Sequence, residues 1–129
     1  MSEALWEKGR TAARSARLLV DPAVADANGA VNRAYFAMFH AARTALTAVD
    51  SDLGHVKRHA TVIGRFGRHI VKGRGLNVQL GRDLSLAFDL RTIADYEPVR
   101  IDLRDAAELV GTAEGFVAAV EQFLAQAKP

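Results

Sequence analysis

Apolar residues recur every three or four positions along most of the chain, which is the period of an amphipathic α-helix. No segment shows the strict alternation of apolar and polar residues that is typical of a half-buried strand. The pattern predicts helices over residues 3–20, 30–49, 57–72 and 80–94, and a last helix from Asp102 to about Leu124. Five helices with short links predict an all-α, up-and-down bundle, which we expect to be a single domain over residues 1–129.

Proline, glycine and aspartate predict where these helices begin and end. Asp21-Pro22 ends the first helix, and Asp21 is expected to cap the second. Asn28-Gly29 is expected to interrupt that second helix, because glycine costs up to ~1 kcal/mol relative to alanine in a helix interior. Asp102, with Asp105 three residues later, resembles the capping box of the last helix.

The helix over 30–49 has two faces of different character. At 100° per residue, its expected core face carries Val31, Tyr35, Met38, Phe39, Ala42, Leu46 and Val49. The other face carries Asn32, Arg33, Phe36, His40, Arg43 and Thr47. Phe36 is the one large apolar residue on this polar face, so we expect the face to be covered as well, by a further helix or by another subunit.

The formal net charge of +2 hides an uneven distribution of cations. Between Leu53 and Arg82 the chain has seven lysines and arginines, three of its four histidines, and no aspartate or glutamate. The predicted helix over 57–72 arranges part of this segment as a basic stripe of Arg58, Arg65, Arg68, His69 and Lys72. Such a stripe attracts phosphate-rich ligands or an acidic protein partner, but it is also compatible with a merely solvated helix face.

Composition excludes several classes of protein. The chain has no cysteine, hence no disulfide framework and no thiolate site. No apolar run approaches the ~20 residues of a membrane span and the start lacks the order of a secretion signal, so we expect a cytoplasmic protein. The glycines at 64–67 and 73–75 lack the strand and the lysine of a phosphate loop, and no Gly-x-Ser-x-Gly elbow is present.

Two pairs of residues at helical spacing are candidates for ligand binding. His55 and His59 lie four apart, a spacing that can hold a metal ion, but the surrounding cations oppose a divalent ion. We therefore expect no metal and no cofactor, and phosphate contact by His59 with Lys57 is the more natural role. Arg33 and His40 lie two turns apart on one face, where they could share an anion or could pair with acids of a neighbouring helix.

Arg91 lies in register with the apolar positions of the helix over 80–94, and Asp95 follows one turn later. A buried arginine is costly unless it is paired, and an aspartate four residues on is a ready partner. The structural alternative to a functional role is a salt bridge at the end of the helix, with Tyr96 closing the end of the bundle.

Four blocks of residues, in this order, resemble the small stand-alone HEPN proteins of bacteria and archaea. They are Asn32-Arg33-Ala34-Tyr35 with the residues up to Ala42, Lys57-Arg58-His59, Gly64-Arg65-Phe66, and Leu90-Arg91-Thr92-Ile93-Ala94-Asp95-Tyr96. The resemblance extends from about Ala4 to Leu124. It implies a helical bundle that forms a homodimer and is often encoded beside a minimal nucleotidyltransferase, the two forming a toxin-antitoxin pair.

Active members of this family resemble metal-independent endoribonucleases, in which an arginine and a histidine separated by four to six residues, supplied by both subunits, line a cleft between protomers. In such chemistry an imidazole moves a proton at the ribose 2′-hydroxyl while an arginine neutralises the phosphate. Arg91 matches the family arginine, but the positions for the histidine carry Asp95, Tyr96, Glu97 and Pro98. A carboxylate accepts a proton but does not stabilise a nearby anionic phosphate, so Asp95 weakens the mechanism.

Taken together, the residues and the resemblance predict a HEPN protein on the toxin side of such a pair, with RNA or nucleotide phosphate as ligand. The predicted catalytic group is Arg91, Asp95, Tyr96 and His40, and the predicted phosphate-binding group is Asn32, Arg33, Lys57, His59 and Arg65. This hypothesis requires Arg91 to share a solvent-reachable hollow with the polar face of the helix over 30–49. The alternatives are a non-catalytic helical module for protein-protein interaction and a sensor of small nucleotides.

Overall fold

The computed structural model describes residues 2–127, and all regular structure within this range is helical. The elements are α1 (Ser2–Leu19), α2 (Ala27–Val49), α3 (Ser51–Gly54), α4 (His59–Arg65), the π-helix η1 (Phe66–Lys72), α5 (Val78–Tyr96) and α6 (Leu103–Ala127). The predicted all-α bundle is confirmed, and the five predicted helices correspond to α1, α2, α4 with η1, α5 and α6. The short helix α3 occupies a segment that was expected to be a turn.

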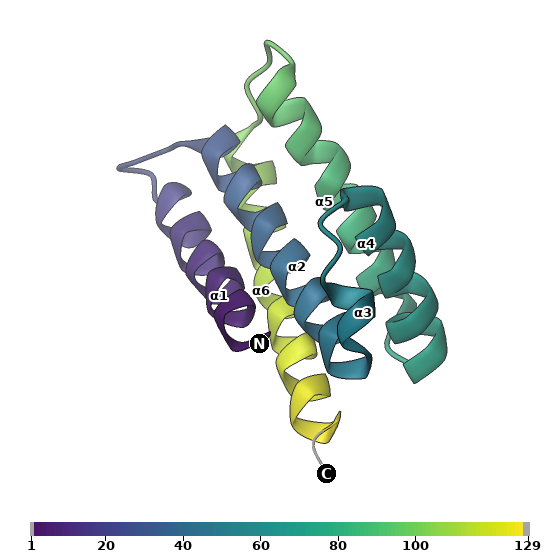
Figure 1. Cartoon of the computed structure of the whole chain (residues 1–129). Helices are drawn as coiled ribbons and strands as arrows, with labels where there is room; N and C mark the ends of the chain where they lie inside the picture. Colours follow the sequence, from purple (N-terminus) through teal and green to yellow (C-terminus); the bar gives the residue numbers. More distant parts are fainter. Residues whose placement is uncertain (1, 128–129) are drawn as a thin grey trace.

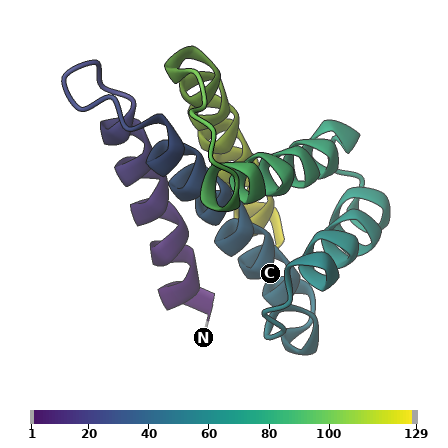
Figure 2. The ribbon, with the colours of Figure 1, turned by 90° about the horizontal axis from the view of Figure 1, so that it is seen from above.

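Helix α2 is the central element and contacts every other helical element. Figure 1 shows α1 along one side of α2, α4 and α5 on the opposite side, and α6 behind it. From above, α5 and α4 lead away from α2 on the side opposite α1 (Figure 2). The largest fully buried side chains are Tyr35, Phe66, Phe116, Met38 and Leu46, so one apolar core connects these helices.

The two predicted faces of α2 differ in burial as expected. Apart from half-buried Val49, the residues of the core face are buried. The six residues of the polar face, Asn32, Arg33, Phe36, His40, Arg43 and Thr47, are all half-buried. The expected cover is present in part: Asn32 donates to Asp95 of α5, and Arg43 donates to the carbonyls of Gly54 and His55 at the end of α3. We call this half-buried face the open face.

The predicted start of the second helix is wrong. Asp21 does not cap a helix; its carboxylate accepts the Ala23 amide at 2.8 Å and closes a turn. Helix α2 begins at Ala27 with Asp26 as its cap, whose carboxylate accepts the amide of Gly29 at 2.9 Å. Gly29 does not interrupt the helix either, because it lies in the first turn, where a Cβ atom would collide with the Asp26 carboxylate.

Asn28 fixes the end of α5 against the start of α2. Its side-chain amide donates to the carbonyls of Ala94 at 3.1 Å and Val99 at 3.0 Å, and its oxygen accepts the amide of Ile101 at 3.0 Å. The predicted cap of the last helix is confirmed, because the Asp102 carboxylate accepts the Arg104 amide at 2.7 Å. These contacts determine where the C-terminal turn of α5 meets the open face. Among the described residues, each helix is too short or too polar to serve as a transmembrane span.

Candidate functional site

Polar side chains from α2 and α5 form a continuous chain of contacts. Asp95, on the last turn of α5, accepts the amide of Asn32 at 3.0 and 3.3 Å and Nη1 of Arg91 at 3.4 Å. The Asn32 oxygen in turn accepts Nε and Nη2 of Arg33 at 3.1 and 2.9 Å. Arg91, Asp95, Asn32 and Arg33 are therefore brought together, with one carboxylate and one amide between two guanidinium groups.

The guanidinium of Arg91 is enclosed by aromatic rings. Arg91 is only 8% exposed, and its Cζ lies 5.2 Å from the ring centroid of Tyr35, 5.4 Å from that of Phe36 and 5.6 Å from that of Phe88. Cation-π attraction and the ion pair with Asp95 compensate the loss of hydration. Its Nε is buried and has no hydrogen-bond partner among the described residues. The contacts with these neighbours therefore compensate the cost of burying the Arg91 guanidinium.

Two guanidinium groups lie near the ring of Phe36. The Cζ atom of Arg33 is 5.3 Å from its ring centroid, and that of Arg91 is 5.4 Å away. Phe36 and Arg33 are half-buried, whereas Arg91 is buried beneath them. We call Arg33, Phe36 and Arg91 the stacking platform. Planar π-systems and guanidinium groups of this kind are surfaces on which unpaired nucleobases stack.

His59 is held within the aromatic cluster of α2 and α5. Its Nδ1 forms a hydrogen bond with the Tyr35 hydroxyl at 2.5 Å, and its ring stacks on Phe39 with a centroid distance of 4.5 Å. Burial, and then the charge of Arg91, lower the pKa of His59. The exposed Lys57 lies outside this cluster, so the structure does not show the two acting together on one phosphate.

His40 lies on the open face toward α1. Its ring centroid is 5.8 Å from that of Phe36, and its Nδ1 is buried with no hydrogen-bond partner among residues 2–127. Burial lowers the pKa of His40 to about 4, and Arg43, Lys8 and Arg33 act in the same direction. The imidazole is therefore neutral at neutral pH and is able to accept a proton.

The basic stripe is less regular than a uniform α-helix would make it. In the π-helix η1 the backbone bonds connect residues five apart, so the faces change register after Arg65. Arg65 itself uses Nη1 to donate to the carbonyls of Leu53 at 3.1 Å and Asp52 at 3.4 Å, and it holds α3 in place. Four cations of this part of the chain are exposed to solvent: Lys57, Arg58, Arg68 and Lys72.

The structural alternative is confirmed in its salt bridge, because Nη1 of Arg91 lies 3.4 Å from the Asp95 carboxylate. Its second part is wrong, because Tyr96 is 72% exposed and does not close the end of the bundle. The residues that sequence reasoning missed are Tyr35 and Phe88, which enclose Arg91. Phe36 was noticed as an apolar residue on a polar face but was not assigned to the site. Its position as a single apolar residue among polar ones was the signal that could have placed Phe36 in the site. Nothing in the sequence distinguished Phe88 from a core residue.

A sequence model of the HEPN domain matches residues 2–123. The chain belongs to the HEPN domain family. A UPF0332 protein of Gloeobacter violaceus, glr0978, is 32% identical over 124 residues, which cover 95% of this chain and 94% of that protein. A UPF0332 protein of Thermotoga maritima is 30% identical over 102 residues, 78% of this chain and 75% of that protein.

A third HEPN relative has a name that refers to function. The protein named "Putative toxin MJ0605" of Methanocaldococcus jannaschii is 33% identical over 95 residues, 74% of this chain and 69% of that protein. In this HEPN chain no histidine follows Arg91, but the imidazoles of His40 and His59 lie on two sides of Phe36, with ring centroids 5.8 and 5.9 Å away. The site therefore combines arginine and imidazole groups from different helices.

Proposed function

We propose that this HEPN protein binds single-stranded RNA or nucleotide phosphate across the open face of α2, as the toxin-side or partner subunit of a toxin-antitoxin-like pair. The observation that carries the proposal is the stacking platform, in which the guanidinium groups of Arg33 and Arg91 lie 5.3 and 5.4 Å from the ring of the half-buried Phe36. The name of the Methanocaldococcus relative supports the toxin side. The family resemblance supports a minimal nucleotidyltransferase as the antitoxin partner.

The surroundings of the platform suit a polyanionic strand. Helix α4 and η1, which form the middle of the acid-free segment 53–82, pack on α2 and α5 beside the platform. The exposed Lys57, Arg58, Arg68 and Lys72 attract phosphates without selecting a sequence. For strand cleavage, we assign His40 as the imidazole that accepts the 2′-hydroxyl proton while the 2′-oxygen bonds to phosphorus and the bond from phosphorus to the 5′-oxygen breaks. The His40 imidazolium then returns the proton to the leaving 5′-oxygen, and Arg33 is the more accessible guanidinium for the phosphate.

Substituting Phe36 tests the proposal directly. Phe36→Ala is expected to weaken binding of a single-stranded oligoribonucleotide about tenfold, because one stacked base contributes roughly 1–3 kcal/mol. Fluorescence anisotropy of a labelled oligonucleotide measures the dissociation constant. Phe36→Tyr keeps the π-face and should bind like the wild type, whereas Phe36→Leu keeps apolar volume without it. Equal affinity of the leucine variant and the wild type would contradict the platform.

We propose that the homodimer forms through the outer face of α5. This helix is apolar on both sides: Leu84 and Ala87 are buried in the core, while Val78, Leu86 and Ile93 are 56%, 56% and 41% exposed. The outer face is also self-complementary. An antiparallel copy of α5, related by a twofold axis between residues 85 and 86, would pair Val78 with Ile93 and exposed Arg82 with exposed Asp89.

A charge swap tests this interface. Asp89→Arg places two arginines opposite each other at both ends of the twofold contact and is expected to weaken dimerisation about tenfold. The double variant Arg82→Asp with Asp89→Arg restores opposite charges and should recover the dimer. Sedimentation velocity over a range of protein concentrations measures the dimer dissociation constant. A double variant as weak as the single one would place the interface elsewhere.

The second candidate function is a non-catalytic module for protein-protein interaction. It is favoured by the enclosure of Arg91, which leaves little of that guanidinium to meet a phosphate, and by the exposed cations of η1, which could dock an acidic protein. A wild-type protein that binds no oligoribonucleotide at low ionic strength would favour this alternative.

A further inference from the structure

A hollow of about 590 Å³ lies between α1 and α2, beside the open face. Its polar lining consists of Glu7, Lys8, Thr11 and Ser15 from α1 with Arg33 and His40 from α2. The two helices approach closely at its edge, because a Cβ atom at Gly9 would lie 3.2 Å from the Ala37 carbonyl oxygen and 3.3 Å from Cβ of His40. The hollow therefore has a wall fixed by direct backbone packing.

The lining of this hollow is rich in hydrogen-bond donors. Lys8 and Arg33 bring two positive charges, and the one carboxylate, that of Glu7, accepts Nη1 of Arg10 at 3.3 Å. The hydroxyl oxygen of Thr11 accepts Nη2 of Arg14 at 3.1 Å, which leaves its hydrogen free to be donated. An ammonium, a guanidinium and a hydroxyl are the donors that typically hold a phosphate.

The side chain of His40 lies in a positive electrostatic potential at the wall of the hollow. Its Nδ1 is buried without a partner among the described residues. Three cations, Arg43, Lys8 and Arg33, add to burial in lowering its pKa. A bound anion would reduce this like-charge repulsion and is the species that the hollow favours.

We propose that the hollow between α1 and α2 binds one phosphate group of a nucleic-acid strand, held by Lys8 and Arg33 with the Thr11 hydroxyl as a further donor. The assignment rests on the proposed function, because Arg33 belongs both to the hollow and to the stacking platform. A base stacked at Phe36 would have a neighbouring phosphate in the hollow. The strand would then cross α2 from the side of α4 toward α1.

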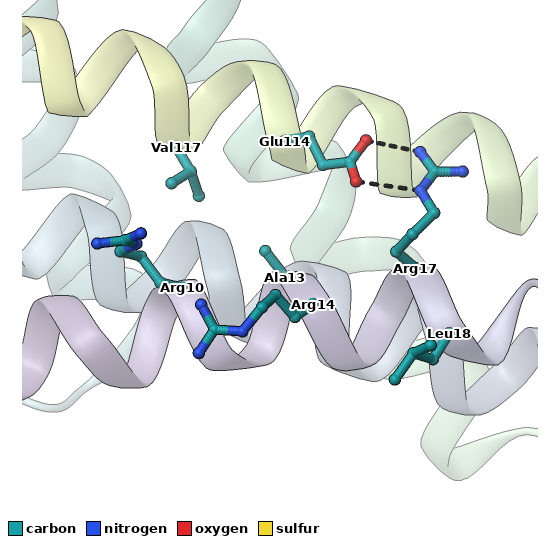
Figure 3. Close-up of a pocket in the computed structure, with 7 residues that line it drawn as sticks. All are labelled: Arg10, Ala13, Arg14, Arg17, Leu18, Glu114 and Val117. Atoms are coloured by element: carbon teal, nitrogen blue, oxygen red, sulfur yellow. Dashed lines mark hydrogen bonds and ion pairs between the residues drawn. The ribbon is translucent and has the colours of Figure 1, made fainter.

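A second hollow on α1 provides the matched control. It has a volume of about 560 Å³ and lies between α1 and α6, with Ala13 and Val117 on its floor and three arginines along α1 (Figure 3). One of these, Arg17, binds the carboxylate of Glu114 through two hydrogen bonds of 2.6 and 3.0 Å. Arg17→Ala therefore removes one exposed cation from the same helix without touching the proposed phosphate hollow, because neither Arg17 nor Glu114 lines that hollow.

The first experiment follows the ring resonances of His40 by NMR during titration with inorganic phosphate. We expect a saturable shift in the wild type and in Arg17→Ala, and its loss in Lys8→Ala. Absence of a saturable shift in the wild type, or an unchanged shift in Lys8→Ala, would overturn the proposal.

The second experiment measures how oligoribonucleotide binding depends on salt concentration. It distinguishes failure of the phosphate hollow from failure of the proposed function. Loss of one phosphate contact in Lys8→Ala should reduce the slope of log affinity against log salt by about 0.7, while Arg17→Ala keeps the wild-type slope. An unchanged slope in Lys8→Ala, with RNA binding intact, would overturn the hollow alone. If phosphate shifts His40 but the wild type binds no RNA, the strand assignment is overturned together with the proposed function.

Discussion

Arg91→Ala is expected to lower the free energy of unfolding by about 3 kcal/mol, at the lower end of the range for removing one partner of a buried ion pair. The substitution leaves the Asp95 carboxylate, whose side chain is 28% exposed, without its cation. It also removes the guanidinium that Tyr35, Phe36 and Phe88 enclose, and it opens a cavity there. Urea denaturation followed by circular dichroism measures the change.

Two further variants show which contact of Arg91 stabilises the fold. Asp95→Asn keeps a hydrogen-bonding group opposite Asn32 and is expected to cost only about 1 kcal/mol. Arg91→Lys keeps the charge but lacks the planar group that lies over three rings, so it should fall between the two. A change below about 1 kcal/mol in Arg91→Ala would show that the enclosure of the guanidinium contributes little.

The stability of these variants decides how their activity is interpreted. Expression of the wild type and of Arg91→Ala at matched soluble levels compares growth and RNA integrity between them. Equal growth and equal RNA integrity would remove Arg91 from the predicted catalytic group. Loss of RNA binding in a folded Arg91→Lys variant would instead show that the guanidinium group contributes to RNA binding as well as to packing.

The sequence predicts the helices and both faces of α2 because burial in a helical bundle imposes a 3.6-residue period. The buried Val31, Tyr35 and Met38 and the half-buried Asn32 and Arg33 follow that period. The buried Leu84, Ala87 and Arg91 of α5 follow it as well, which is why the unusual position of Arg91 was visible in the sequence.

Features that depend on two helices meeting were beyond prediction. Asp21 and Asp26 are both capable caps, and the choice of Asp26 places Asn28 where its side chain binds the link between α5 and α6. The aromatic enclosure of Arg91 combines residues of α2 with Phe88 of α5, whose relative rotation no local pattern contains. The contact between Asn32 and Asp95 depends on that same rotation.

Stability is expected to fall as the pH decreases from 7 to 5, and His40 is expected to account for about 2 kcal/mol of that loss. Burial, with Arg43, Lys8 and Arg33, lowers its pKa from 6.5 to about 4. The unfolded chain binds a proton at His40 below about pH 6.5, whereas the folded chain does so only near pH 4. Each pH unit in between therefore favours the unfolded state by about 1.4 kcal/mol.

His40→Gln removes the titrating group and should reduce the stability difference between pH 7 and pH 5 by that amount, measured by urea denaturation at both pH values. His59, whose pKa burial also lowers, remains in the variant and accounts for part of the remaining loss. His55→Gln is the control, because it makes the same substitution at a histidine whose side chain is exposed. An equal pH dependence in the wild type and His40→Gln would mean that water or an anion reaches His40, so that burial does not keep its imidazole neutral.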